Sequence, residues 1–478
     1  MINTQGDHFS TFYMMEDFLA RNYLGSFAVV ALVAANIYAA GDWLIYGDQS
    51  CIIRKDILSS GAGYNHPANI EQLANGDLLI ATVAGSGEGE STRIGAYKST
   101  NNGDSWSDMI NVTPVGSAFD PTLAQAENGD IYCFYFKGNY TSCCDDQKFR
   151  VSTDNGNTWG SEYDISTMAG VADDELQAGE QSNCLRHPNG DWLCGWSETY
   201  NGGQGYTSHI LKGDLGSPSD WTKHFALDQL WSPDFLVVNP ANTVDGHFQE
   251  IVAFCRTEFH NVGPKWAKSQ DGGKTWSSFN WVDPSENVGC VARDGISFGA
   301  AGTGVSLDLG TAGSPSGNLT GWHVIAHGSD ARYCPESGCS QTRCSRYFMR
   351  VWIGNNPLDA SSWQEKLEMR ESSAGDENAD CSIIQAQDRK IHLIWTGRGS
   401  NAVRYAKIDP DILIGATEIK SRTSRSAAYS TAVNSHSRML YNVTGQCLGS
   451  TGMHTQAKGI VIEKLETGLV RRVFMTNN

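Results

Sequence analysis

Ionisable side chains recur at one position of a repeated pattern, directly after short apolar runs. We interpret them as a polar ring that converges on one site, because scattered surface charges would not keep the phase of a repeat. The alternative is that each residue ends an ordinary strand that reaches solvent, where charge is common. The six residues are Glu88, Lys137, Glu198, Arg256, His327 and Arg398.

A second set of polar residues opens the strand that precedes each apolar run. Its members are His66, Asp120, Glu180–Gln181, Asp294 and Asp380. Acids combined with arginines are the inventory of glycoside chemistry: one carboxyl held protonated as acid, another group as base or nucleophile, and guanidinium groups for a sugar carboxylate. A histidine could serve as general base or hydrogen-bond donor, and a structural role is equally open. We predict His66, Glu88, Asp120 and Glu198 as catalytic, and Lys137, Arg256, His327, Asp380 and Arg398 as substrate-binding.

An eight-residue stretch that occurs in three near-copies indicates the scaffold for these residues. The copies are Ser99–Trp106, Ser152–Trp159 and Ser269–Trp276. Each contains an Asp or Asn that can bond its own backbone, a Gly that can take positive φ, and a Trp that can be buried. The stretch therefore predicts a hairpin corner that is repeated along the chain, and repeats of this kind determine the fold.

Apolar strands recur between these corners. Three follow an Asn-Gly-Asp turn, at Asn75–Leu79, Asn128–Tyr132 and Asn189–Leu193. The same strand recurs without that turn at 247–256, 322–327 and 390–396, and degenerate corners occur at 218–221 and 358–363. A spacing of roughly 50–70 residues suits four-stranded blades, and radial closure leaves few exposed sheet edges. We predict an all-β fold, a six-bladed β-propeller over residues 41–410, with ligands at its central mouth.

Composition narrows the class of protein and of partner. The chain has 478 residues and a formal net charge of −18, which argues against nucleic acid as a partner. Of its 13 cysteines, Cys133, Cys194 and Cys255 fall in apolar strands and are predicted to be free thiols. A group of three in a polar insertion could form a disulfide or bind a metal: Cys334, Cys339 and Cys344. No cofactor is predicted.

The two ends of the chain differ in composition from the region between them. Residues 1–40 have the pattern of a signal peptide with an N-terminal extension and cleavage near Ala40; a buried helix is the alternative. Residues 411–437 have a linker composition, and 438–478 contain strand-like runs that predict a small C-terminal β module. We therefore expect an exported protein, secreted or at the cell surface.

The repeated corner and two longer stretches resemble one protein family. The pattern Ser-x-Asp-x-Gly-x-x-Trp is similar to the Asp box of sialidases and bacterial neuraminidase repeats, with Asn101 replacing Asp in the first copy. Asn65–Leu79 with Gly85–Gly89 resembles the opening of the neuraminidase-repeat-like branch of the sialidase superfamily, and Ala379–Ala386 with Ile391–Trp395 resembles its last blade. The similarity covers residues 60–410 and implies a sialidase-like propeller. The C-terminal module resembles a sorting domain of the type IX secretion system of bacteria, which implies a bacterial protein with secretion machinery as a partner.

The resemblance also sets out where this chain departs from sialidases. Family members bind the sialate carboxylate with three arginines, the first in a Phe/Tyr-Arg-Ile-Pro motif, and use an Asp acid with a Tyr/Glu nucleophile pair. This chain has His66-Pro67 in place of Arg-Ile-Pro and Asn378–Asp380 in place of the Tyr, while Arg256 and Arg398 match carboxylate-binding arginines.

Three functional readings follow from these residues. The leading hypothesis is an exo-glycosidase that releases a terminal acidic sugar from a glycan. The second is a polysaccharide lyase in which His66 is the base and Arg256 neutralises a uronate carboxylate. The third is a glycan-binding propeller without turnover. All three expect a glycan or polysaccharide as the partner.

Overall fold

The computed structural model describes most of the region predicted as the propeller and the strands of the C-terminal module. The described residues are 43–59, 64–86, 91–138, 147–165, 184–200, 205–213, 222–228, 230–257, 265–280, 303–307, 319, 321–329, 348–359, 362–371, 378–397, 402–415, 439–441, 447–450, 459–464 and 470–476. The chain divides into two compact units, Met1–Ile419 and Lys420–Asn478. The predicted signal peptide, most of the predicted linker and Cys334, Cys339 and Cys344 lie outside the described residues.

Antiparallel sheets built from consecutive strands make up the N-terminal unit. The first sheet contains β3 (Tyr64–Gln72), β4 (Leu78–Gly85), β5 (Arg93–Ser99) and β6 (Ile110–Asn111), and the second contains β7 (Ala118–Gln125), β8 (Ile131–Lys137), β9 (Gln147–Ser152) and β10 (Tyr163–Asp164). The third contains β11 (Leu185–Arg186), β12 (Trp192–Tyr200), β13 (Gly205–Gly213) and β14 (Thr222–Asp228), and the fourth contains β15 (Leu230–Val237), β18 (Ile251–Thr257), β19 (Lys265–Ser269) and β20 (Ser277–Asn280).

Two further sheets recruit strands from the start of the chain. The five-stranded sheet contains β21 (Thr303–Ser306), β22 (His323–Ser329), β23 (Phe348–Gly354), β24 (Gln364–Glu371) and β1 (Trp43–Gly47). The closing sheet contains β25 (Asn378–Gln385), β26 (Ile391–Gly397), β27 (Ala402–Ile408) and β2 (Ile52–Leu58). Smaller elements are the hairpin β16 (Thr243–Val244) and β17 (His247–Phe248), the 3-10 turn η1 (Gln49–Cys51) and the helix α3 (Pro410–Gly415).

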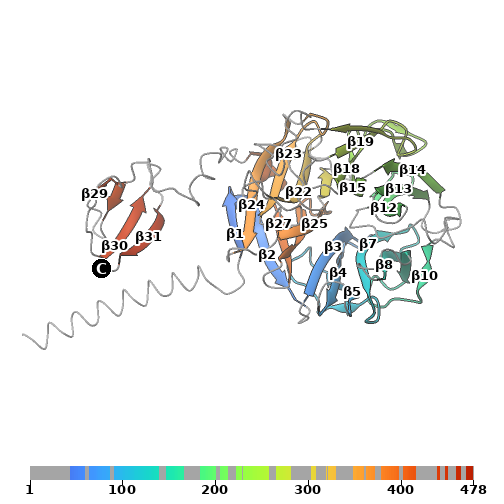
Figure 1. Ribbon diagram of the computed structural model, residues 1–478, viewed down its shortest axis with the longest axis horizontal. Helices are drawn as coiled ribbons and strands as arrows, with labels where there is room; N and C mark the ends of the chain where they lie inside the picture. The colour runs from blue at the N-terminus through green and yellow to red at the C-terminus, as the bar shows by residue number, and fades with distance from the viewer. Residues whose placement is uncertain are drawn as a thin grey trace, which may run out of the picture. The chain divides into compact units, whose positions relative to one another are not determined.

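The arrangement is propeller-like, as the sequence predicts. Figure 1 shows the sheets around a common centre, with β3, β7, β15 and β25 toward it; we call the first strand of each sheet its inner strand. Within the described residues, five sheets of this unit have the four strands of a blade. The predicted number of six blades is wrong: the sheet of β21–β24 is not a four-stranded blade, because β1 adds a fifth strand by pairing with β24. β1 and β24 lie far apart in the sequence, so the regular spacing of the apolar strands did not reveal their pairing.

The three repeated stretches fold alike, as predicted. In each, a Ser hydroxyl accepts a bond from a Gly N–H four residues on, at 2.8 Å in every copy. Two successive residues take positive φ, for example Asn155 (58°) and Gly156 (79°), which is the left-handed region that Asn and Gly tolerate best. Gly156 packs against Leu79 of the preceding sheet, where a Cβ would lie 3.1 Å from its side chain. These turns therefore join neighbouring sheets.

Buried side chains also tie the inner strands to one another. Each acts as an acceptor for a backbone N–H of the next inner strand, so the bond satisfies a group that the strand edge would leave exposed. Three such bonds are described: Leu123 N to Asn69 Oδ1 (2.9 Å), Ile70 N to Ser382 Oγ (3.1 Å) and Gly304 N to Asp234 Oδ2 (2.7 Å).

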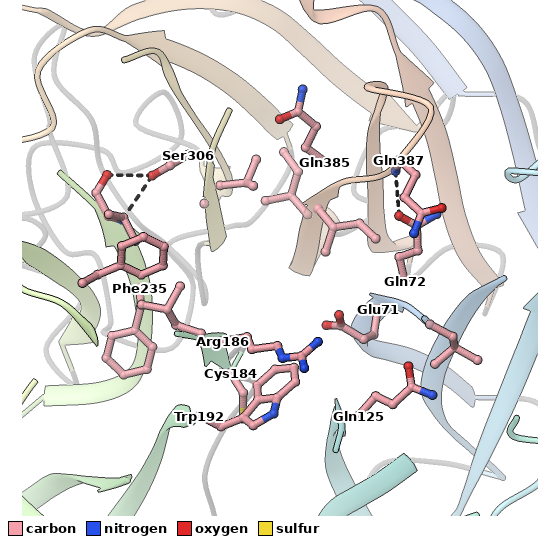
Figure 2. A pocket seen from close by; sticks show the side chains of 18 of the residues that line it. Glu71, Gln72, Gln125, Cys184, Arg186, Trp192, Phe235, Ser306, Gln385 and Gln387 are labelled. Atoms are coloured by element: carbon pink, nitrogen blue, oxygen red, sulfur yellow. Dashed lines mark hydrogen bonds between the residues drawn. The ribbon is translucent and has the colours of Figure 1, made fainter. Parts of the chain in front are cut away.

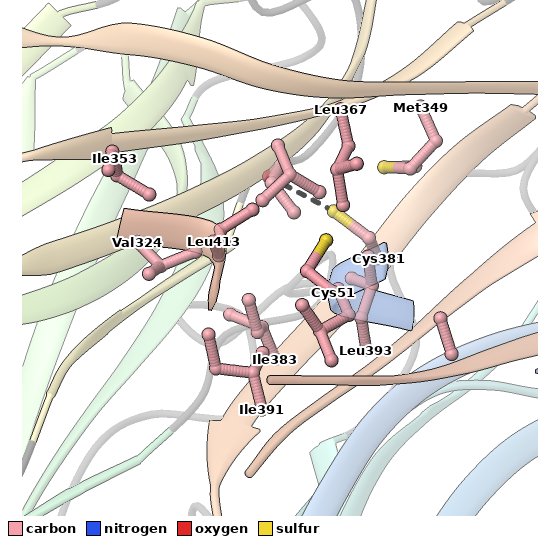
Figure 3. Packing of buried hydrophobic residues seen from close by; sticks show 14 of the residues in the cluster. Cys51, Val324, Met349, Ile353, Leu367, Cys381, Ile383, Ile391, Leu393 and Leu413 are labelled. Atoms are coloured by element: carbon pink, nitrogen blue, oxygen red, sulfur yellow. Dashed lines mark hydrogen bonds between the residues drawn. The ribbon is translucent and has the colours of Figure 1, made fainter. Parts of the chain in front are cut away.

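Apolar side chains fill the wedges between sheets. The largest cluster lies between the five-stranded sheet and the closing sheet (Figure 3). It includes Met349 and Leu367 from the former and Ile391 and Leu393 from the latter, each fully buried. Cys51, from the N-terminal segment, fills the same wedge, which explains why β1 and β2 are held there.

The described cysteines partly correct the prediction of free thiols. Cys133 is buried and free, as expected, but Cys194 forms a disulfide with Cys184, across the β11–β12 hairpin. The side chain of Cys255 lies outside the described residues. Cys194 was misjudged because its partner falls before the Asn-Gly turn, where the sequence shows no strand signal.

Loss of this disulfide should destabilise the protein. The bridge closes a loop of 10 residues, which corresponds to about 3 kcal/mol of denatured-state entropy. We expect the double variant Cys184→Ala, Cys194→Ala to show that loss in urea unfolding. A thiol reductant should lower the unfolding free energy of the parent protein but not of the double variant; equal sensitivity of both would contradict the assignment.

The C-terminal unit has its own antiparallel sheet. It contains β29 (Cys447–Ser450), β28 (Met439–Tyr441), β30 (Gly459–Lys464) and β31 (Val470–Thr476), in that order. No helix among the described residues of the chain is both long and apolar enough to cross a membrane.

Candidate functional site

Strand register places most of the predicted site residues at one end of the sheets. His66 near the start of β3 pairs with Val83 near the end of β4, and Lys137 at the end of β8 pairs with Ala118 at the start of β7. Arg256 pairs with Trp231 in the same way. Because consecutive strands are antiparallel, the start of an inner strand and the end of its partner share an edge. Glu198, His327 and Asp380 lie at the corresponding ends of β12, β22 and β25.

Some of these residues are placed only in part. Glu88 and Arg398, as well as Glu180–Gln181 and Asp294, lie outside the described residues. For His66, Glu198, Arg256 and Asp380 the structure describes the backbone but not the side chain.

Two of the predicted acids lie at β-bulges in equivalent positions. The register of β7 with β8 shifts between Phe119 and Thr122, around Asp120, and that of β25 with β26 shifts between Ala379 and Cys381, around Asp380. Each Asp lies five residues before the last residue of its strand. Bulges re-aim side chains and are frequent beside active sites. The sequence had aligned these two residues, and the structure brings them to matching points on either side of β3, whose inner-strand neighbours are β7 and β25.

Asp120 is buried and has a strained backbone conformation. Its side chain is 6% exposed, and its backbone takes a φ of 46°. A non-Gly residue at positive φ is uncommon, and such strain persists only where surrounding structure holds it, frequently at functional sites. The following Pro121 lacks an N–H, which an inner strand tolerates because its free edge faces the centre.

Lys137 and His327 each contact side chains of their own sheet or of the loop beside it. The Lys137 ammonium is 2.8 Å from Glu162 Oε1, and Tyr135 donates to the other oxygen of that carboxylate at 2.7 Å. His327 is fully buried, and its ring stacks on Trp352 with centroids 6.2 Å apart. His327 therefore packs in the interior of its sheet, and its substrate-binding role stays a prediction. Lys137 remains exposed at the predicted edge.

A cavity of about 300 Å³ lies at the opposite end of the inner strands. Its polar wall includes Glu71, Gln125 and Arg186, and its apolar wall includes Phe235 and Ile383. Figure 2 shows the side chains of Glu71 and Arg186 directed toward one another, with Trp192 beneath the guanidinium. The guanidinium carbon lies 6.0 Å from the centroid of the Trp192 ring, within the range of a cation–π contact.

The carboxyl in this cavity has perturbed acidity. Burial raises the pKa of Glu71 to about 8, although a hydrogen bond from the Gln72 backbone and the charge of Arg186 oppose the rise. At neutral pH the carboxyl is therefore mostly protonated and can donate a hydrogen bond. Titratable groups with shifted pKa values in a cavity mark candidate functional sites.

The sequence prediction missed this second region. Its signal was present three residues before each Asn of the Asn-Gly turns, where Gln72, Gln125 and Arg186 stand at one repeat position. The sequence analysis gave these residues no role. Within the described part of the chain, no group of three or more His, Cys, Asp or Glu residues is gathered closely enough to bind a metal.

Comparisons with solved structures support the fold. A Hadza microbial sialidase superposes with a TM-score of 0.52 at 11% identity, over 77% of this chain and 68% of its own. A mutant of Trypanosoma rangeli sialidase with trans-sialidase activity gives 0.52 at 14% identity, over 79% and 60%. A protein of unknown function from Dyadobacter fermentans gives 0.51 at 14% identity, over 76% and 99%. No protein-family model and no curated protein matches the sequence. At these identities the likeness shows a sialidase-like fold.

Proposed function

We propose that this chain is an exported, sialidase-like hydrolase that releases a terminal acidic sugar from glycans. The observation that carries the proposal is the pair of bulges that present Asp120 and Asp380 at matching points of two inner strands, at the edge that also holds His66 and Arg256. The sialidase-like fold supports the same reading.

The proposed roles follow from chemistry. Glycosidases use two carboxyl groups on opposite sides of the scissile bond, one as acid and one as base or nucleophile. We assign this pair to Asp120 and Asp380, with Glu88 and Glu198 as further candidates from neighbouring sheets. Arg256 and Arg398 are proposed to bind the sugar carboxylate, because the guanidinium fork matches its two oxygens. Lys137 and His66 are proposed to contact the rest of the substrate.

The test is turnover by the purified full-length protein on sialosides and on matched neutral glycosides. We expect release of the acidic sugar, and we expect Arg256→Ala to lower kcat/KM for the acidic substrate by roughly 10²-fold, as loss of a charge-assisted pair predicts. Turnover of any matched neutral glycoside should change little in this variant. Equal loss on both substrates would contradict a carboxylate-binding role, and absence of turnover on the whole panel would refute the hydrolase.

A lyase is the second candidate, and one observation favours it. Strand register places His66 and Arg256 at the same edge, as base and carboxylate partner of an elimination would require. The same assay on uronate-containing polysaccharides distinguishes the two, because a lyase forms unsaturated products that absorb ultraviolet light. Binding of glycan without any product would instead indicate a glycan-binding propeller.

Export is part of the proposal. A disulfide between Cys184 and Cys194 suits an oxidising compartment, and residues 1–40 have a signal-peptide pattern. Secretion or display at a bacterial cell surface, and sorting through the C-terminal sheet, remain predictions.

A further inference from the structure

Glutamines at one repeat position form hydrogen bonds that link neighbouring sheets at the cavity end. Gln125 donates to Gly129 O of its own turn at 2.8 Å and accepts from Ala74 N of the first sheet at 2.6 Å. Gln72 does the same, donating to Gly76 O at 3.1 Å and accepting from Gln387 N at 2.6 Å. Because a carboxamide both donates and accepts, one side chain satisfies two backbone groups.

Arg186 occupies this position in the third sheet and cannot play that part. A guanidinium has no acceptor, so it cannot take a bond from the neighbouring turn. Its nearest carboxylate is Glu127, with Nη2 and Oε1 3.9 Å apart, beyond hydrogen-bond range. The side chain instead lies over Trp192 and faces Glu71 (Figure 2). The third sheet therefore has a cation at the cavity where the first and second sheets have a glutamine that links two sheets.

The lining defines the ligand that would fit. Arg186 and Glu71 are the charged residues among the described residues that line the cavity, and Glu71 is mostly protonated at neutral pH because burial raises its pKa to about 8. The polar wall therefore carries a net positive charge and two donors. The facing wall is apolar, with Phe235, Val305 and Ile383. Pockets that combine apolar lining with a few convergent polar groups are typical ligand sites.

We propose that this cavity binds a small organic carboxylate, whose anionic group contacts Arg186 and Glu71 and whose apolar part contacts Phe235. The site is separate from the proposed catalytic edge, because Asp120 lies five residues before Gln125 at the cavity end of the same strand, roughly 16 Å of extended chain. The inference is independent of the proposed function.

Benzoate is the probe, and calorimetric titration of the full-length protein is the measurement. We expect benzoate to bind, and Arg186→Gln to weaken it by at least roughly tenfold, as loss of a charge-assisted bond predicts. We expect this variant to fold, because Gln stands at the equivalent position in the first, second and closing sheets. If Arg186→Gln did not fold, Arg186→Lys, which keeps the charge but not the fork, should still weaken binding.

A second readout uses the ionisation of Glu71. In the parent protein, benzoate affinity should fall as pH rises through about 8, since the carboxylate formed then repels the ligand. The variant Glu71→Gln should remove this dependence.

Three outcomes would overturn the proposal. They are no benzoate binding by the parent protein, binding that Arg186→Gln leaves unchanged, and inorganic phosphate binding as tightly as benzoate, which would mean that the apolar wall is not used.

Discussion

Replacing Asp120 by Asn should lower turnover by at least about 10²-fold while leaving the protein folded. Asn keeps the shape of the side chain and tolerates the positive φ at this position, but it cannot transfer a proton. Removal of a general acid or base lowers the rate by about 10²–10⁴-fold. The measurement is kcat on the acidic glycoside found in the substrate panel, with the melting temperature recorded alongside.

Asp154→Asn is the matched control for this variant. Asp154 belongs to a repeated corner, where it accepts bonds from Thr158 N at 2.8 Å and Thr158 Oγ1 at 2.6 Å. We expect a loss of stability of about 1 kcal/mol and an unchanged kcat. If Asp154→Asn removed activity at an unchanged melting temperature, or Asp120→Asn kept full activity, the division between scaffold and site would be wrong.

Replacing Asp388 by Asn should cause a large loss of stability. Asp388 Oδ2 lies 2.9 Å from the Lys407 ammonium, and its Oδ1 lies 3.2 Å from Nε2 of the fully buried His392. The Nδ1 atom of His392 is 2.7 Å from the hydroxyl of Tyr405, which Gly103 of the first repeated corner approaches. This network therefore holds the closing sheet against the first.

Asn should preserve the turn at position 388, because the first three sheets already have Asn at this turn position. In Asp388 the side chain accepts a bond from Lys390 N at 2.9 Å, as Asn128 does from Asp130 N at 3.0 Å. The variant thus keeps the turn and removes only the charge, leaving the buried Lys407 with the more distant carboxylate of Asp104, whose Oδ1 lies 3.6 Å from the ammonium. We expect a loss of about 3 kcal/mol in urea unfolding. Asn128→Asp, which adds a charge at the exposed equivalent, should change stability little.

The same network predicts how stability depends on pH. Burial alone would raise the pKa of Asp388, but hydrogen bonds from His392 and Lys407 outweigh it and hold the pKa well below the usual carboxyl value. A depressed folded-state pKa gives stability that is present above the ordinary carboxyl pKa of about 4 and is lost as pH falls through the folded value. The parent protein should therefore lose more stability than Asp388→Asn below about pH 4. Parallel curves would contradict the proposed network.

Local sequence patterns determined much of the scaffold. The Asn-Gly turns, the three corners and the strands after them could be predicted because they depend on residues close in sequence: a Gly or Asn at positive φ and a short side chain that bonds its own turn. The shared position of Asp120 and Asp380 could also be predicted, because the repeat phase carries it.

Tertiary structure decided what depends on partners far along the chain. The pairing of β1 and β2 with β24 and β27 joins segments separated by most of the propeller, and no local pattern specifies it. The interior place of His327, the bond between Cys184 and Cys194, and the approach of Glu71 to Arg186 each require two sheets or strands to be in position. Such contacts arise from packing and closure of the sheets rather than from periodicity, which is why the sequence analysis did not predict the cavity.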